Sequence, residues 1–218
     1  MSFSILFKDE LNGFYRSKVM LFLWMGLPLM AILLKLWSPD MQGEIPFSTF
    51  TALMISSIGG TLVSVMLAVS IINEKSNGVY DLFVIRPIRR RNLLISKFLT
   101  VFLCVVAAAL IALSLTMVLD LGTSGVLPPM ESLMESLVLS VSIMGVASAV
   151  GVLIGVASPS VLVGAILVVY GGAQISALSA LPSLMGWENG TVMTALIAMA
   201  ITIVFMTIAG VYFSKKQF

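Results

Sequence analysis

Side chains capable of catalysis or metal binding are scarce in this sequence of 218 residues. It contains no histidine and a single cysteine, Cys104. Metal sites built on histidine, Ser-His or Cys-His nucleophiles and a disulfide framework are therefore excluded. The sequence also lacks a Gly-x-x-x-x-Gly-Lys-Ser/Thr loop that would hold nucleotide phosphates. We expect no catalytic residue, no metal site and no cofactor in this chain, which is not predicted to be an enzyme.

The side chains that remain for binding are charged, and half of the basic ones lie between residues 73 and 97. Residues 79–85, in the middle of this stretch, are strongly apolar. A loop that only joined two helices would be shorter and more polar. Ser76-Asn77-Gly78 predicts a turn or a helix start, and the helix that follows would end before Pro87. Its apolar patch would consist of Val79, Leu82, Phe83 and Ile85.

Three interpretations of this stretch compete. A polybasic anchor for anionic lipid would explain Arg89, Arg90 and Arg91 but not an exposed Leu82-Phe83 pair. Nucleic-acid binding is not expected of so short a cluster beside a membrane. A docking helix for a soluble partner would use Leu82 and Phe83 as apolar anchors surrounded by charge. We favour docking, which is compatible with lipid binding by the arginines.

The elements around this stretch are predicted membrane spans. Hydrophobic residues make up 59% of the chain, charged residues 10%, and the mean hydropathy is +1.11. Soluble domains are about 45–50% apolar and about 25% charged, so a soluble globular protein is excluded. Since one crossing takes about 20 helical residues, we expect an all-α membrane protein with six transmembrane helices. The charge-free apolar ranges are 19–34, 45–73, 98–119, 136–158, 159–187 and 189–214.

The six ranges contain no ionisable side chain, although such groups mark proton relays, ion sites and voltage sensors. Proton-driven transport, voltage sensing and intramembrane proteolysis are therefore not expected. Any energy for active transport would have to come from another polypeptide. The charge-free interior favours an apolar or amphipathic substrate such as a lipid, a hydrophobic peptide or a drug, without identifying it.

The loops predict the orientation. With six spans and the N-terminus in the cytoplasm, eleven of the twelve basic residues lie on the cytoplasmic side and only Lys35 does not. This distribution follows the positive-inside rule. We therefore expect a multi-pass protein of the cell membrane with both termini cytoplasmic, forming a single transmembrane domain over residues 1–218 without internal repeats.

Two further patterns concern packing. In residues 2–18, large apolar side chains recur at helical spacing, which predicts an amphipathic helix in the membrane interface. Small residues also recur at every fourth position of two spans, which allows close helix packing. Packing within the chain and a subunit interface both remain open. The two rows are Ser56, Gly60, Ser64 and Ala68, and Ala147, Gly151 and Gly155.

The order Glu74, Gly78, Asp81-Leu82, Pro87-Ile88 and Lys97 resembles the signature between the second and third spans of type-2 ABC transporter permeases. The overall plan is also similar, including a short turn at 158–160 and a segment, 178–187, that could dip back from the outer face. The resemblance implies an ABC exporter in which each permease pairs with a second copy or a related permease. Each would rest on a separate ATP-binding-cassette subunit, where ATP and magnesium would bind.

The resemblance also implies a role for segment 74–91, which would couple the ATPase to the spans. The coupling residues would be Glu74, Gly78, Tyr80, Asp81, Leu82, Phe83 and Pro87, with Arg89, Arg90 and Arg91 as basic residues at the membrane surface. Tyr80, Phe83 and the triple arginine depart from what is common in the family. The alternative is a non-transporting scaffold or passive pore whose polybasic segment binds lipid.

Overall fold

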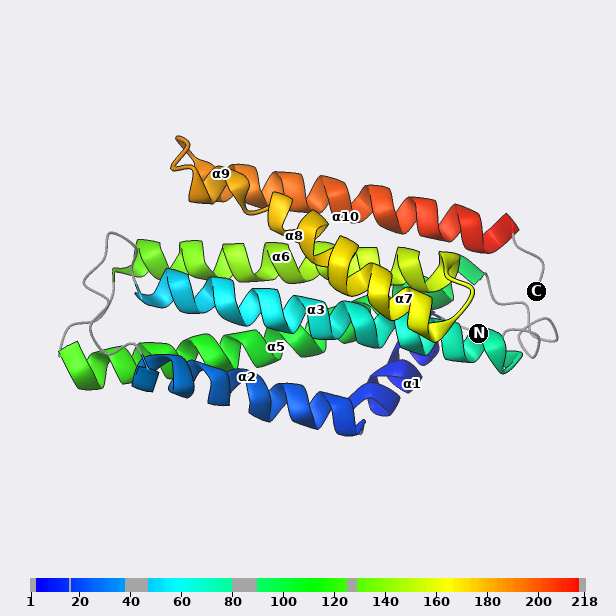
Figure 1. Ribbon diagram of the computed structural model, residues 1–218, viewed down its shortest axis with the longest axis horizontal. Helices are drawn as coiled ribbons and strands as arrows, with labels where there is room; N and C mark the ends of the chain where they lie inside the picture. The colour runs from blue at the N-terminus through cyan, green and yellow to red at the C-terminus, as the bar shows by residue number, and fades with distance from the viewer. Residues whose placement is uncertain (1–2, 16, 38–46, 80–89, 125–128, 216–218) are drawn as a thin grey trace.

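The computed structural model describes residues 3–15, 17–37, 47–79, 90–124 and 129–215. Within these ranges the chain forms helices joined by turns, arranged as a bundle of long, roughly parallel rods (Figure 1). Six helices are long and apolar enough to cross a membrane. The prediction of an all-α protein with six membrane-spanning helices is confirmed.

The short helix α1 (Phe3–Tyr15) precedes the spans. The first four are α2 (Lys18–Trp37), α3 (Phe47–Ser76), α5 (Arg90–Ser124) and α6 (Met130–Ala157). The fifth consists of α7 (Val161–Leu167), a π-helical turn η2 (Val168–Gly172) and α8 (Ala173–Leu178). A four-residue helix, α9 (Leu181–Leu184), leads to the sixth span, α10 (Gly190–Lys215).

Helix boundaries differ from the apolar ranges where polar residues continue a helix. Helix α5 begins at Arg90 although the apolar range begins at residue 98, and α6 begins at Met130 rather than 136. A helix continues as long as its backbone hydrogen bonds are made, whereas hydropathy only marks the part that suits hydrocarbon. Lys97 consequently lies two turns inside α5.

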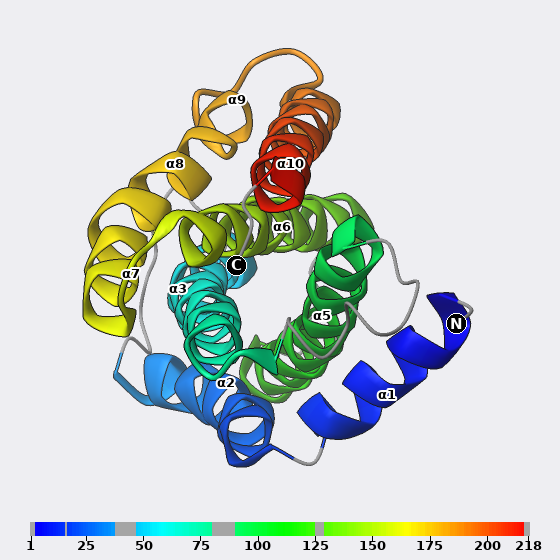
Figure 2. The ribbon, with the colours of Figure 1, turned by 90° about the vertical axis from the view of Figure 1, so that its right-hand side faces the viewer.

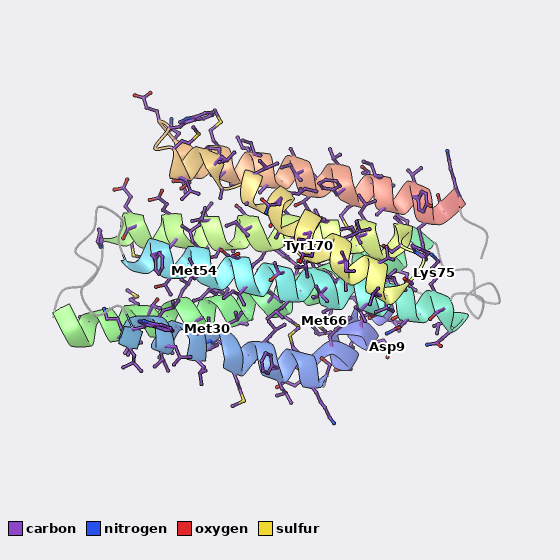
Figure 3. All side chains as sticks on the ribbon, viewed as in Figure 1. Asp9, Met30, Met54, Met66, Lys75 and Tyr170 are labelled. Carbon is purple, nitrogen blue, oxygen red and sulfur yellow. The ribbon has the colours of Figure 1, made fainter. Side chains whose placement is uncertain are left out.

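Helix α1 and the last turn of α10 lie at the same end of the bundle (Figure 1). We call this the α1 end; it also contains the end of α3, the start of α5 and the α6–α7 turn. Asp9 and Lys75 are both found there, while Met54 lies toward the opposite end (Figure 3). An even number of spans requires both chain ends on one side of the membrane, and the positions of α1 and of the last turn of α10 are consistent with this. Which side of the membrane this is remains a prediction.

Helices α3 and α6 form the centre of the bundle, with α2, α5, α7 and α10 around them (Figure 2). The two rows of small residues face each other here. A Cβ at Gly151 would lie 2.6 Å from the Cα of Ser64, and one at Gly155 would lie 3.0 Å from the Cα of Ala68. The rows therefore serve close packing within the chain, which answers the question that the sequence left open.

Helix α9 folds back against the first turns of α10 at the opposite end. The amide of Ser183 donates to the Thr194 hydroxyl at 3.2 Å, and the Ser183 hydroxyl donates to the Glu135 carboxylate of α6 at 2.8 Å. Gly190 allows this approach because a Cβ there would lie 2.7 Å from the carbonyl oxygen of Pro182. Segment 178–187 thus returns against its neighbours, while its depth in the membrane stays a prediction.

Candidate functional site

The candidate site lies at the α1 end, where α3 ends and segment 74–91 begins. Glu74 is on the last turn of α3, and Gly78 follows that helix with a φ of 64°. This left-handed conformation suits glycine and commonly ends a helix. The amide of Gly78 donates to the carbonyl of Lys75 at 3.3 Å, which closes a turn after α3, so the predicted turn at 76–78 is confirmed.

The other predicted coupling residues lie outside the described part of the chain, as does one of the three arginines predicted at the membrane surface. The coupling residues are Tyr80, Asp81, Leu82, Phe83 and Pro87, and the arginine is Arg89. Arg90 begins α5, and the side chain of Arg91 crosses to α10, where a Cβ at Gly210 would lie 3.3 Å from its Cγ. The predicted docking helix and its apolar patch therefore stay predictions.

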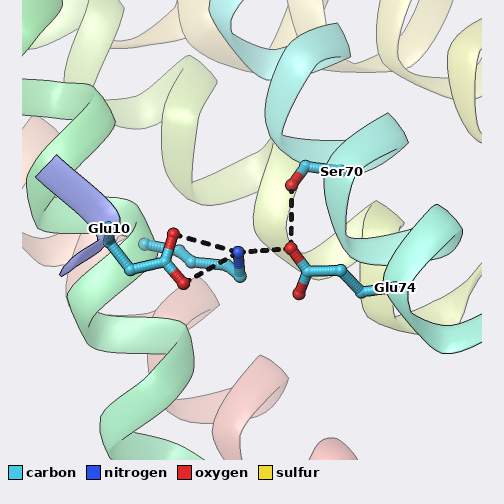
Figure 4. Close-up of polar contacts among 4 residues, drawn as sticks. Glu10, Ser70 and Glu74 are labelled. Atoms are coloured by element: carbon cyan, nitrogen blue, oxygen red, sulfur yellow. Dashed lines mark hydrogen bonds and ion pairs between the residues drawn. The ribbon is translucent and has the colours of Figure 1, made fainter. Parts of the chain in front are cut away.

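Glu74 takes part in a buried ion bridge that joins three helices (Figure 4). The Lys97 ammonium of α5 lies 3.0 Å from Oε1 of Glu10 on α1, and it donates to Oε2 of that carboxylate at 3.1 Å. The same ammonium also donates to Oε1 of Glu74. The hydroxyl of Ser70, one turn earlier on α3, donates to that Glu74 oxygen at 3.3 Å. We call Glu10, Lys97 and Glu74 the charge bridge.

Burial sets the electrostatics of the charge bridge. The side chain of Lys97 is 4% exposed, against 20% for Glu10 and 26% for Glu74. Burial raises the pKa of Glu10 despite the opposing attraction of Lys97, and the nearby Glu74 carboxylate adds to the increase. The Lys97 ammonium also lies 5.6 Å from the centroid of the Phe14 ring, within cation–π range. The charge bridge is therefore a costly arrangement in which the buried Lys97 ammonium offsets the charge of two carboxylates.

A polar cavity of about 290 Å³ opens beside the charge bridge. Residues of α1, α3 and α5 line it. The lining residues are Asp9, Glu10, Gly13, Phe14, Ser17, Ser70, Glu74 and Lys97.

A second connection joins α3 to the α6–α7 turn. Lys75, the residue after Glu74, donates from Nζ to the carbonyl of Ser158 at 3.1 Å. Ser160 then caps α7, accepting a hydrogen bond from the amide of Val163 at 3.4 Å. The short turn predicted at 158–160 is thus present, and it is bonded to the end of α3. Consecutive residues of α3 therefore contact elements on two sides of the helix.

Two members of the charge bridge were missed as site residues by sequence reasoning. Lys97 was named only as the last residue of the family signature, without a predicted role. Glu10 was not named as a candidate at all. One signal could have identified Glu10: it lies at helical spacing between Leu6 and Phe14, which are the residues of α1 that the bundle buries. Phe3, a large apolar residue in the predicted amphipathic helix of residues 2–18, is by contrast 39% exposed. Helix α1 contacts α5 along this stripe, and its position in the membrane interface remains a prediction.

Comparison with known proteins places the chain in a family. The family model described as ABC-2 family transporter protein matches residues 6–174, which include most of α1, the charge bridge, the first four spans and most of the fifth. A search of curated proteins found no match. Six membrane-spanning helices and a match over more than half of its length lead to one conclusion: this chain belongs to the ABC-2 transporter family and is a transport permease, the membrane component of a transporter.

Proposed function

We propose that this permease is the transmembrane subunit of an ATP-driven exporter and that segment 74–91 couples it to a separate ATP-binding-cassette subunit. The observation that supports this most directly is the position of Glu74. It lies on the last turn of α3, where segment 74–91 begins, and through Lys97 it is joined to α5 and α1. A displacement of the segment would therefore be transmitted to three helices at once.

Packing of α3 supports the same mechanism. Because Gly151 and Gly155 bring α6 against the backbone of α3, the two helices are in close contact at this point. Lys75 adds the bond to the α6–α7 turn. Movement at the end of α3 would consequently carry the central pair of helices with it. ATP and magnesium would bind in the partner, since this sequence lacks a phosphate-binding loop.

The remaining parts of the proposal follow from the family and the charge distribution. A second permease, identical or related, would complete the substrate pathway. The α1 end would face the cytoplasm, because it contains most of the basic residues. Arg89, Arg90 and Arg91 would then hold the assembly near anionic head groups. The substrate would be apolar or amphipathic.

The test disrupts the predicted docking surface at Leu82 and Phe83 while leaving the residues of the helical bundle unchanged. We expect Leu82→Asp combined with Phe83→Asp to abolish co-purification of the cognate ATPase and the ATP hydrolysis stimulated by the permease, because desolvating two carboxylates in an apolar groove is unfavourable. Leu121→Asp combined with Met130→Asp, at exposed positions near the opposite end, is the matched control and should retain both.

Two results would contradict the proposal. One is full ATPase stimulation by the Leu82→Asp, Phe83→Asp variant. The other is accumulation of a solute against its gradient by vesicles that contain this chain alone. If replacing the three arginines abolishes activity while Leu82 and Phe83 can be changed freely, the scaffold or passive-pore alternative replaces the exporter.

A further inference from the structure

Helix α1 lies outside the ring of spans, beside α5 and α2 (Figure 2). Its side toward the bundle buries Leu6 and Phe14, each 9% exposed, and Glu10 lies between them at helical spacing. Other apolar side chains of α1 are not covered by the bundle, since Ile5 is 53% exposed and Tyr15 is 60% exposed. Exposed apolar side chains on an amphipathic helix suit the membrane interface. The helix thus has apolar side chains for two environments, the bundle and the interface.

Docking of α1 on the bundle takes the Glu10 carboxyl out of water and places it among other charges. Its side chain is 20% exposed in the docked helix. The charged groups that act on it are Lys97 of α5, Glu74 of α3 and the adjacent Asp9 of α1. Lys18, the first residue of α2, is exposed. Loss of water and the two carboxylates favour the protonated form of Glu10, whereas the ammonium favours the ionised form.

Burial is the largest of these influences. It raises the pKa of Glu10 above 4.5, although Lys97 opposes the rise. On a detached α1 the same carboxyl would be surrounded by water and would have its ordinary pKa. By linkage, the docked state with its raised pKa is favoured at low pH, and it loses this advantage as the pH rises through the raised pKa. Docking and protonation of Glu10 therefore favour each other.

The polar cavity beside the charge bridge gives protons access to the docked carboxyl. Glu10, Ser17 and Ser70 are among its lining residues, and its volume of about 290 Å³ has room for several water molecules. Protonation does not remove the contact with Lys97, because the carbonyl oxygen of a neutral carboxyl still accepts a hydrogen bond. The docked helix can thus gain or lose the proton without first leaving the bundle.

We propose that α1 is a proton-linked latch, which docks against α5 when Glu10 carries a proton and detaches more readily as that carboxyl ionises. Detachment would leave Lys97 bonded to Glu74 of α3. The end of α3 would then lose its connection to α1 while it kept the one to α5. The inference concerns the contact between α1 and the bundle, and it does not depend on coupling to ATP.

The experiment measures the distance between α1 and α5 at two pH values. Nitroxide labels at Asn12→Cys and Ser114→Cys, both exposed positions, are placed in the full-length Cys104→Ala chain in lipid nanodiscs. Double electron–electron resonance then gives the distance distribution. We expect one predominant population at about pH 5 and a second one at about pH 8, with the ratio of second to first at least about threefold higher at the higher pH.

Two variants assign the proton to one carboxyl. Glu10→Gln cannot ionise, so it should keep the first population predominant at both pH values. Asp9→Asn removes the adjacent, exposed carboxylate of the same cavity and is the matched control, which should retain the pH dependence. If Glu10→Gln responds to pH as the unmodified chain does, the proton binds elsewhere and the proposal is overturned.

A second measurement requires no change at Glu10. In the Cys104→Ala chain, Leu6→Cys is shielded while α1 is docked, whereas Ile5→Cys is exposed. The ratio of their labelling rates with a thiol reagent cancels the pH dependence of the thiol itself, and it should rise with pH as α1 detaches.

Two further results would overturn the proposal. One is a distance distribution that does not change between the two pH values. The other is detachment at the lower pH, which would show that the attraction of Lys97 outweighs the burial of Glu10. Because ATP hydrolysis enters none of these measurements, failure here is distinguishable from failure of the proposed exporter function.

Discussion

Lys97 of α5 and Glu10 of α1 form an ion pair at 3.0 Å, although 87 positions separate them in the sequence. The pair gives α1 a fixed place beside the end of the bundle where α3 leads into segment 74–91. Because Lys97 also binds Glu74, any rearrangement of α3 at this point changes the environment of α1 as well. The N-terminal helix is thereby part of the site.

The cation of the charge bridge should contribute most to its stability. Lys97→Met removes the ammonium that the partly buried Glu10 and Glu74 carboxylates both contact, and removing one partner of a buried pair costs about 3–5 kcal/mol. We expect a marked fall in the midpoint of thermal unfolding of the detergent-solubilised chain. Lys8→Met, which removes an exposed ammonium from α1, should change the midpoint little. Equal midpoints for the two variants would show that the charge bridge does not stabilise the fold.

The raised pKa of Glu10 predicts a pH dependence. The folded state favours the protonated carboxyl, so this residue's contribution to stability is complete below its ordinary pKa of 4.5 and is lost as the pH rises through the raised pKa. The Gln side chain of a Glu10→Gln variant cannot ionise, so this variant does not lose that stability as the pH rises. The free energy of unfolding of the variant, relative to that of the unmodified chain, should therefore increase from about pH 4 to about pH 8. Unfolding midpoints across this range measure the difference. Glu131→Gln, an exposed site at the start of α6, is the control, and parallel curves for Glu10→Gln and the unmodified chain would refute the prediction.

Close packing of α3 against α6 should not tolerate even one added methyl group. A Cβ at Gly151 would lie 2.6 Å from both the Cα and the carbonyl oxygen of Ser64. Since these are backbone atoms, Gly151→Ala must separate the helices, at a cost of about 1–3 kcal/mol. Gly122→Ala in α5, where a Cβ meets nothing within 4 Å, should be neutral. Thermal unfolding compares the two, and an unchanged Gly151→Ala variant would mean that the helices are not this close.

The predicted orientation can be tested by labelling single cysteines in a Cys104→Ala background. Gln42→Cys and Gly125→Cys should react with a membrane-impermeant maleimide from outside intact cells. Ser214→Cys, near the end of α10, should react only after the membrane is made permeable. The physical reason is the concentration of basic residues in loops on the side of the α1 end. The reverse labelling pattern would place that end outside the cell.

Hydropathy and the family signature predicted much of this protein because they depend on local information. The length of each apolar range sets the number of crossings, and that number sets which chain ends share a side. Gly78 could likewise be assigned to a turn, since a positive φ favours glycine in any fold. Helix boundaries were less accurate, because Lys97 and Glu74 lie on turns that continue beyond the apolar ranges.

The sequence by itself thus determined a six-span, all-helical membrane protein whose charges cluster near the end of α3. Only the tertiary structure decided which charges meet. Lys97 is 23 positions from Glu74 and 87 from Glu10, so their contacts arise from the packing of three helices and from no local spacing. The same holds for Ser64 and Gly151: the spacing showed that each helix could be approached closely, but the partner of each row depends on how the spans assemble in three dimensions.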